Sequence, residues 1–321
     1  MIKPWRVTID TNPDQCNLNC IMCDTHSIYN NSEYSRKFMS RELLEKSIDE
    51  ALSLRVKEII PTTMGEPLLY KYFDIFIDKL LRSDAKLNLT TNGTFPIIGV
   101  EAWAKKLLPI LSDVKISINS IKSEVNESIM VNDNTLKKLE DIKTFINLRD
   151  KYAPQVSITL QVTFLKSNLD HLEEIIKFAI NYNVNRVKGH QLWITYDEIE
   201  DESLQNSIEK IDKWNAFIDK ISTYKNKISL VNFKKIEFES DNIESIPQNY
   251  NCPFLKEELW IDYNGDFNIC CAPSDKRKTL GYWGNIRDKR IIDVFNSKEY
   301  ILLVQNYKER EICKICSLRR A

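Results

Sequence analysis

Six short runs of apolar and β-branched residues recur in the first two thirds of the chain, and each is followed by a longer segment with helical periodicity. Because parallel strands need a crossover between them, this alternation predicts a parallel sheet covered by helices, open or closed into a barrel. We therefore expect six β/α units. Their strands are RVTI from Arg6, EIIPT from Glu58, KLNLT from Lys86, VKISI from Val114, VSITLQV from Val156 and RVKG from Arg186.

Three intervening segments carry clear helix signals. RELLEKSIDEALS, from Arg41, has apolar residues at helical spacing and follows Ser40, a favourable N-cap residue. YFDIFIDKLLR, from Tyr72, and LDHLEEIIKFAINY, from Leu169, have the same periodicity. The charged positions of such Lys- and Glu-rich helices are expected to face solvent.

Ligands of parallel α/β folds bind at the carboxyl ends of the strands. The chain has only seven glycines, so we expect each to lie where the backbone conformation requires glycine. Gly65 follows the second run, Gly93 follows the third, Gly189 ends the sixth, and a cysteine-rich loop follows the first. The sequence therefore predicts one active-site face at these strand ends.

The 45 basic residues nearly balance the 46 acidic ones, so the chain has no overall charge that would attract nucleic acid or an anionic membrane. The first residues, MIKPWRVTID, do not resemble a signal peptide, and no run approaches the roughly 18 apolar residues of a membrane span. We expect a cytoplasmic protein with no nucleic-acid partner and no membrane partner.

Eight cysteines in a cytoplasmic chain favour metal binding or catalysis over structural disulfides. Three of them lie in QCNLNCIMCDTH, from Gln15 to His26. Three thiolates in one loop could bind zinc, with His26 as the fourth ligand, or an iron–sulfur cluster with one iron left open for catalysis. The spacing leaves both alternatives open.

The spacing CxxxCxxC at Cys16, Cys20 and Cys23 resembles the hallmark of the radical S-adenosylmethionine (radical SAM) superfamily, and further matches follow in order over about residues 6 to 195. The resemblance implies a partial (β/α)6 TIM-type barrel, a [4Fe–4S] cluster on these cysteines, and S-adenosylmethionine bound to its open iron. It also places Met22 where an aromatic residue is common, and Met64 where the family usually has glycine. The remaining positions that it assigns to the cofactor are Gly65, Glu66, Pro67, Thr91, Asn92, Ser117 and Asn119.

The pattern changes near residue 240, which divides the chain into an expected barrel, 1–240, and a small C-terminal domain, 241–321. Within this domain Asn264 and Gly265, in LWIDYNGDFNICC, predict a tight β-hairpin. Paired cysteines of this kind also occur in zinc ribbons. Their order resembles the SPASM and Twitch modules that follow radical SAM barrels, and since the sequence ends soon after the last of them we expect one auxiliary [4Fe–4S] cluster. Its ligands would be Cys252, Cys270, Cys313 and Cys316.

Two further residues are catalytic candidates. Neighbouring side chains of a strand point to opposite faces, so Cys271 should point away from a cluster bound by Cys270. Cys271 would then be a buried small residue or a hydrogen donor to a substrate radical. His190 follows the sixth run and could act as a general base, or be a structural histidine.

The resemblance implies that a reduced cluster cleaves S-adenosylmethionine to a 5′-deoxyadenosyl radical, which abstracts a substrate hydrogen. A fully ligated auxiliary cluster would accept an electron, so the leading hypothesis is the dehydrogenation of a small polar metabolite such as a sugar or aminocyclitol. The early first strand, which leaves no room for an N-terminal peptide-recognition domain, favours it. Alternatives are a peptide- or sugar-modifying epimerase, a thioether-forming enzyme, or a zinc-stapled binding protein. Expected partners are the small-molecule or peptide substrate and an electron donor such as flavodoxin or ferredoxin.

Overall fold

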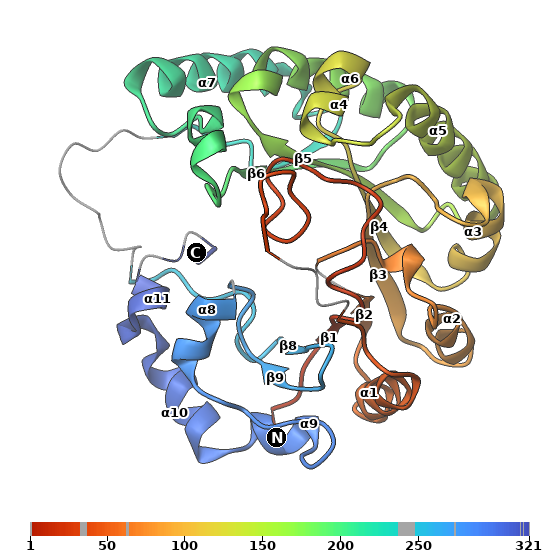
Figure 1. The fold of residues 1–321 in the computed structure, drawn as a ribbon, viewed down its shortest axis with the longest axis vertical. Coiled ribbons are helices and arrows are strands. Elements are labelled where there is room, and N and C mark those ends of the chain that lie inside the picture. Colours follow the sequence, from red (N-terminus) through yellow and green to blue (C-terminus); the bar gives the residue numbers. More distant parts are fainter. Residues whose placement is uncertain are drawn as a thin grey trace.

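The computed structural model describes residues 2–32, 37–61, 64–236, 248–272, 274–314, 316 and 318–320 of the chain. All six predicted strands are present and pair in parallel with their neighbours in sequence order. Figure 1 shows them as a curved, open sheet with helices on its outer face, which confirms the predicted partial barrel. The strands are β1 Arg6–Ile9, β2 Glu58–Pro61, β3 Lys86–Thr91, β4 Leu111–Ser117, β5 Ser157–Phe164 and β6 Arg186–Gln191.

The three predicted helices form close to their expected bounds. The Ser40 hydroxyl accepts a hydrogen bond from the Leu43 amide (3.3 Å) and so caps α1 as predicted. The segment from Leu169 begins in a 3-10 turn, Lys166–His171, before α6. The barrel helices are α1 Arg41–Ser53, α2 Asp74–Leu80, α3 Gly99–Leu107, α4 Ser123–Ile129, α5 Thr135–Tyr152, α6 Leu172–Asn181 and α7 Ile208–Ile221.

The C-terminal segment extends the sheet of the barrel instead of forming a separate unit. The predicted hairpin is present as β8 Glu258–Ile261 and β9 Phe267–Asn268, which pair antiparallel. β8 also pairs in parallel with β1, from Arg6 opposite Glu258 to Ile9 opposite Ile261. With a short seventh strand, β7 Ser229–Val231, which the sequence does not predict, the sheet has the order β7-β6-β5-β4-β3-β2-β1-β8-β9.

One apolar core spans both parts of the chain. Val7 and Ile9 of β1, Leu259 of β8 and Phe267 of β9 are buried in the same cluster. The C-terminal helices pack on this extension of the sheet (Figure 1). They are α8 Ser274–Arg277, α9 Ile291–Phe295, α10 Lys298–Asn306 and α11 Glu311–Lys314. The predicted domain boundary near residue 240 lies outside the described residues.

Charged side chains join β1 to β8 and fill the base of the barrel. Glu258 is 2 % exposed and accepts hydrogen bonds from the Arg6 guanidinium and from the Thr8 hydroxyl (2.6 Å). Asp113 pairs with both Arg186 (2.9 Å) and Lys115 (3.5 Å).

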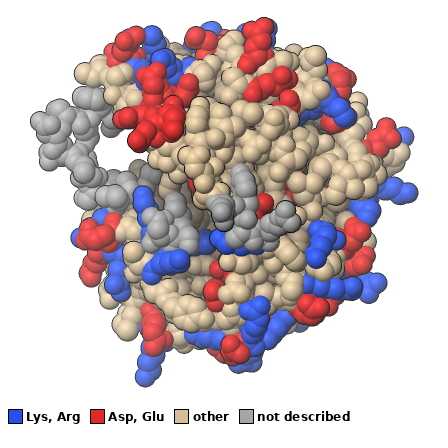
Figure 2. Space-filling view, viewed as in Figure 1, with Lys and Arg blue, Asp and Glu red and all other residues tan. Residues whose placement is uncertain are grey.

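On the face of the molecule that Figure 2 shows, acidic and basic side chains are interspersed. No helix of the described residues has the length and apolarity needed to cross a membrane.

Candidate active site

The cysteine loop after β1 places three sulfur atoms in a partly buried apolar environment. Burial, followed by the nearby Cys23 and Cys16 thiols, raises the pKa of Cys20 to about 12. Burial also raises the pKa of Cys23 to about 11, and the His26 amide donates a hydrogen bond to its sulfur (3.2 Å). Neighbouring thiolates without a cation would repel one another, so this donor set fits a bound iron–sulfur cluster. Leu18 and Ile21 of the loop pack in one cluster with Ile129, Met130, Leu165, Leu192 and Ile199.

His26 does not serve as the fourth zinc ligand through its Nε2 atom. That atom lies 2.8 Å from the carbonyl oxygen of Pro13, in a side chain that is 4 % exposed. Among the described residues no three His, Cys, Asp or Glu side chains gather closely enough to hold a single metal ion. The contact of His26 with Pro13 therefore argues against the zinc alternative with His26 as a ligand.

The segment Met64 to Pro67, after β2, lies directly against the cysteine loop. Gly65 has a φ of +76°, and a Cβ atom there would lie 2.4 Å from the carbonyl oxygen of Asn12 and 2.6 Å from that of Gln15. The Glu66 amide donates to the same Gln15 oxygen (2.7 Å). Only glycine fits this approach, which brings the predicted cofactor segment against the predicted cluster ligands.

Glu66 connects the ends of β2 and β3. Its carboxylate is 1 % exposed and accepts hydrogen bonds from the Thr91 hydroxyl (2.9 Å), the Asn92 amide (2.7 Å) and the Leu68 amide (3.1 Å). Burial raises the pKa of Glu66 to about 7, although these hydrogen bonds oppose the shift. Glu66 and Thr91 therefore position the backbone around the site. Their roles in cofactor binding, and that of Pro67, stay predictions.

The other predicted cofactor residues lie near the same face. Asn92 Nδ2 donates to Asn17 (2.8 Å) and lies 3.7 Å from the sulfur of Cys16. Asn119 is buried, and its Oδ1 accepts from the Thr163 amide (2.9 Å), so this oxygen holds the loop after β4. Ser117 ends β4, and Met22 packs partly buried beside the cysteines.

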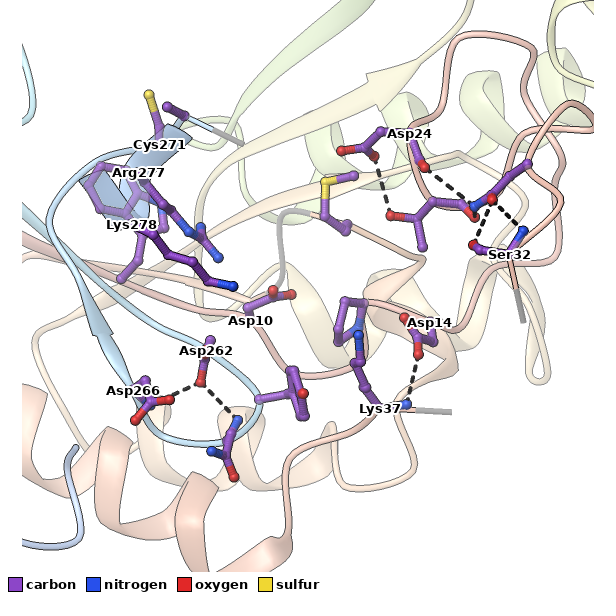
Figure 3. A pocket seen from close by; sticks show the side chains of 18 of the residues that line it. Asp10, Asp14, Asp24, Ser32, Lys37, Asp262, Asp266, Cys271, Arg277 and Lys278 are labelled. Carbon is purple, nitrogen blue, oxygen red and sulfur yellow. Dashed lines mark hydrogen bonds between the residues drawn. The ribbon is translucent and has the colours of Figure 1, made fainter. Parts of the chain in front are cut away.

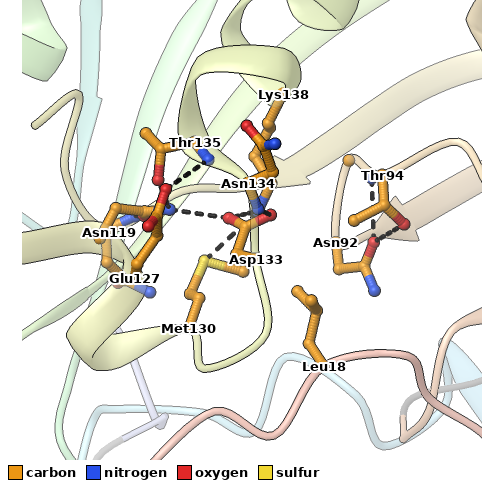
Figure 4. Close-up of polar contacts among 12 residues, drawn as sticks. Leu18, Asn92, Thr94, Asn119, Glu127, Met130, Asp133, Asn134, Thr135 and Lys138 are labelled. Carbon is orange, nitrogen blue, oxygen red and sulfur yellow. Dashed lines mark hydrogen bonds and ion pairs between the residues drawn. The ribbon is translucent and has the colours of Figure 1, made fainter. Parts of the chain in front are cut away.

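The sequence interpretation missed a buried ion pair beneath the cysteine loop (Figure 4). Lys138 of α5 lies 2.5 Å from Asp133, and both side chains are 1 % exposed. Asn126 donates to the same carboxylate (2.7 Å). Lys138 is close enough to Cys20 for its charge to oppose the rise in the pKa of that thiol, although burial dominates. The expectation that helix charges face solvent is wrong for Lys138, because it lies on the buried face of α5 together with Ile142 and Phe145.

The four predicted auxiliary ligands come together from three segments of the C-terminal part. Burial raises the pKa of Cys313 to about 12, and the thiols of Cys270, Cys252 and Cys316 add to the shift. Cys252 precedes β8, Cys270 follows β9 and Cys313 lies on α11. Four thiols in mutual proximity fit the full set of ligands of a cubane cluster.

Cys271 is not the buried small residue that one interpretation expects. Its side chain is exposed to a cavity, and the reason is that β9 ends at Asn268, before the two cysteines. The strict alternation of a strand therefore does not apply to this pair. The thiol of Cys271 contacts that of Cys270, and this contact is the main reason that the pKa of Cys270 is lowered to about 7.

His190 lies within β6 and does not follow it. Burial and the nearby ammonium of Lys188 lower the pKa of His190 to about 4, so the imidazole is neutral near pH 7. Packing requires glycine at the neighbouring position 189, because a Cβ atom of Gly189 would lie 1.7 Å from the ring of Phe164. A neutral imidazole at the carboxyl end of a barrel strand can accept a proton, and the catalytic role of His190 stays a prediction.

A cavity of about 730 Å³ opens between the cysteine loop and the C-terminal hairpin (Figure 3). Asp24 and Thr25, next to Cys23, line one side of it, and Cys271 and Ala272, next to Cys270, line another. Met64 of the segment after β2 also reaches the wall. The cavity is thus bounded by residues adjacent to both cysteine groups.

The sequence matches two family models. The Radical SAM superfamily model matches residues 13–179, and the SPASM model, described as an iron-sulfur cluster-binding domain, matches residues 252–317. The radical SAM cyclopropyl synthase TigE of Paramaledivibacter caminithermalis is 26 % identical over 295 residues, which are 86 % of this chain and 58 % of TigE. The chain therefore spans little more than half the length of this curated relative.

Solved structures share the fold. SuiB of Streptococcus suis superposes with a TM-score of 0.67 at 17 % identity, covering 98 % of this chain and 71 % of SuiB. BtrN gives a TM-score of 0.52 at 15 % identity, covering 99 % of this chain and 94 % of BtrN. The cofactors are accordingly S-adenosylmethionine, a [4Fe–4S] cluster that binds it, and an auxiliary iron–sulfur cluster. From the cysteine loop, the strand-end segments and the family match together, the chain belongs to the radical SAM superfamily and carries a C-terminal SPASM domain.

Proposed function

We propose that this enzyme oxidises a residue of a peptide substrate held in the cavity between the two cysteine groups. The observation that carries the proposal is the composition of the cavity wall, in which Thr25 neighbours the Cys23 ligand and Ala272 neighbours the Cys270 pair. A substrate bound there lies within reach of both redox sites. A solvent-filled cavity of about 730 Å³ is large enough for a side chain with its flanking backbone.

When bound, the cofactors supply a 5′-deoxyadenosyl radical that removes one hydrogen atom and an auxiliary acceptor for one electron, so that loss of a proton completes a two-electron oxidation. The chain's own residues orient the substrate and accept the proton. His190, neutral near pH 7, lies in β6 outside the lining of this cavity, and it is a candidate acceptor for a substrate that extends toward the barrel strands. Cys271 can contact the substrate from the side of the C-terminal domain, because its thiol is open to the cavity.

Relatives support a peptide as the substrate class. SuiB has been solved with its precursor peptide SuiA, and anSMEcpe with the Cp18Cys peptide. The test incubates the reconstituted chain, without oxygen, with S-adenosylmethionine, a reduced flavodoxin or dithionite, and pools of synthetic peptides. We expect 5′-deoxyadenosine together with peptides that have lost two hydrogen atoms. A variant with Cys16, Cys20 and Cys23 all replaced by Ala should form neither.

The second candidate is the dehydrogenation of a small polar metabolite such as a sugar or aminocyclitol. It is favoured by the polar wall of the cavity, which includes Asp24, Thr25 and Asn30, and by the shared fold of BtrN, solved with AdoMet and 2-DOIA. The same assay with polyols and aminocyclitols distinguishes this candidate function from the oxidation of a peptide. Dehydrogenation of these alcohols, with every peptide unchanged, would replace the peptide proposal.

Cys271 distinguishes oxidation from a redox-neutral epimerisation, in which a thiol returns a hydrogen atom to the substrate radical. Cys271→Ala should keep about eight iron atoms per chain, whereas Cys270→Ala should lose about half of them. If Cys271→Ala retains its iron and forms deoxyadenosine but no product, and the wild-type product carries a solvent deuteron at carbon, epimerisation is the reaction. Reversed iron losses would contradict the assignment of Cys270 as the ligand.

A further inference from the structure

The charged side chains of the cavity differ in whether they already have partners. Five aspartates and three cations line it, so a simple count predicts a cationic ligand. The aspartates of the hairpin, however, are engaged within the hairpin. Asp262 accepts from the amides of Asn264 and Asp266, both at 2.9 Å, and Asp266 accepts from the side-chain amide of Asn285 (2.8 Å). These two carboxylates stabilise the turn and are poor candidates for binding a ligand.

On the barrel side, the carboxylates also have partners. Asp14 accepts from the Lys37 amide (3.0 Å), and Asp24 accepts from the Thr25 hydroxyl (3.3 Å). These hydrogen bonds fix the loop that carries the cysteine ligands. Four of the five aspartates are therefore part of the construction of the wall, so the acidic count alone does not define the charge of the ligand.

Arg277 and Lys278 are different. Arg277 ends α8, Lys278 follows it, and both side chains extend from the C-terminal domain into the cavity (Figure 3). Lys278 extends toward Asp10 on the facing wall, yet no ion pair joins Arg277 or Lys278 to any acidic residue in the described part of the chain. The cations at the barrel base, by contrast, include Arg6 and Arg186, which are paired with Glu258 and Asp113.

We propose that Arg277 and Lys278 bind a carboxylate of the substrate, the side chain of a Glu or Asp residue in a peptide. This inference rests on the proposed function, because it specifies the peptide class that the same cavity accepts. A guanidinium has five donors in a planar fork that matches a carboxylate, and Arg277 is partly buried, so the pair is screened less than one on the open surface. The walls beside it include the rings of Trp260 and Tyr263, which can cover the apolar part of the bound side chain.

S-adenosylmethionine also carries a carboxylate and must be distinguished from the substrate as the source of the anion. The segment assigned to the cofactor, around Gly65, lies against the loop of Cys16, whereas Arg277 and Lys278 line the cavity together with Cys271 and Ala272, next to Cys270. The two cations therefore belong to the auxiliary side of the cavity. This position favours the substrate.

The experiment measures binding of fluorescein-labelled octapeptide pools to the full, anaerobically reconstituted chain with S-adenosylmethionine present. The pools are random except for one central residue, which is Glu, Gln or Lys. We expect the Glu pool to bind about tenfold more tightly than the Gln pool, which is the discrimination typical of one well-placed charged pair. In Arg277→Gln/Lys278→Gln the preference should disappear, and in Arg277→Glu/Lys278→Glu the Lys pool should bind best. Lys225→Gln/Lys227→Gln, at two exposed positions outside the cavity lining, removes the same two charges and is the matched control for net charge.

Iron content and S-adenosylmethionine affinity are measured on every variant, so that misfolding is recognised. Equal binding of the Glu and Gln pools by the wild type, or an unchanged preference in the double variant, overturns this inference and leaves the peptide proposal standing. Loss of S-adenosylmethionine binding in the absence of peptide, with full iron content, overturns it by assigning the cations to the cofactor. If no pool binds, both the inference and the peptide substrate are overturned.

Discussion

Gly65 is the position at which a single added carbon should disturb the site most directly. In Gly65→Ala the new Cβ atom would overlap the Asn12 and Gln15 carbonyl oxygens, at 2.4 and 2.6 Å, and so push the segment after β2 away from the cysteine loop. We expect at least a tenfold weaker affinity for S-adenosylmethionine, with the auxiliary cluster retained. Equilibrium binding and iron analysis measure the two effects.

Gly99→Ala is a matched control for the backbone conformation. Gly99 has a φ of +78°, but a Cβ atom there would meet nothing within 4 Å. Gly99→Ala should therefore lower the free energy of unfolding by about 1 kcal/mol, through the strain of the left-handed backbone alone. It should bind the cofactor normally. Equal effects of the two substitutions on cofactor affinity would contradict a role for the contact at Gly65.

His190 gives a prediction for pH dependence. Its pKa is lowered from 6.5 to about 4 in the folded chain by burial and by Lys188, so between these values the unfolded chain binds the proton and the folded chain does not. The free energy of unfolding should therefore fall as the pH falls through 6.5 toward 4. Between pH 7.5 and 5.5 the wild type should lose about 1 kcal/mol more than His190→Gln, as measured by urea unfolding. A wild-type dependence in His190→Gln would refute the shift.

At the scale of elements, the contact between β1 and β8 depends on a buried carboxylate. Glu258→Ala removes the hydrogen-bond acceptor of Arg6 and Thr8 and leaves the partly buried guanidinium of Arg6 with its longer contact to Glu58 (3.7 Å). We expect a loss of about 2 to 3 kcal/mol in the free energy of unfolding. Glu257→Ala changes an exposed neighbour and should stay within about 0.5 kcal/mol of the wild type. A similar small effect at Glu258 would show that the backbone pairing alone joins the strands.

The elements also show what sequence patterns can and cannot predict. Strands such as RVTI and VSITLQV are recognisable because β-branched runs are bounded by helical periodicity, and the hairpin at Asn264 and Gly265 is a local turn signal. The pairing of β8 with β1 joins residues about 250 positions apart in the sequence, and it leaves no local pattern. β7, with three residues, is too short to stand out.

At the site, spacing and family resemblance identified the cysteine groups, but the environment of single side chains required the fold. Lys138 and Arg277 lie in charged stretches that look solvent-facing in the sequence, yet one is buried in an ion pair and the other lines the cavity. The sequence predicts strand geometry at Cys271, but the strand ends two residues before Cys270. Each of these depends on tertiary packing, which periodicity does not encode.

At the scale of the whole molecule, the barrel and the C-terminal domain share one sheet and one core. A chain ending at residue 236 would lose β8, expose the edge of β1 and uncover residues packed against Leu259 and Ile261, which are 0 % exposed. We expect this truncated chain to aggregate, because an unpaired apolar strand edge associates readily. Solubility and size-exclusion chromatography measure this, and a soluble monomer that still cleaves S-adenosylmethionine would refute it.

The pairing of β1 with β8 also governs how the two redox sites are spaced. One cysteine group follows β1, the other is reached through the hairpin that β8 begins, and the two strands are adjacent and in register. Their separation is held by backbone hydrogen bonds, which do not depend on side-chain identity. The separation of the two cysteine groups can therefore remain constant while the cavity loops diverge. Selection for a new substrate can act on residues such as Arg277 and Lys278 without moving one cysteine group relative to the other.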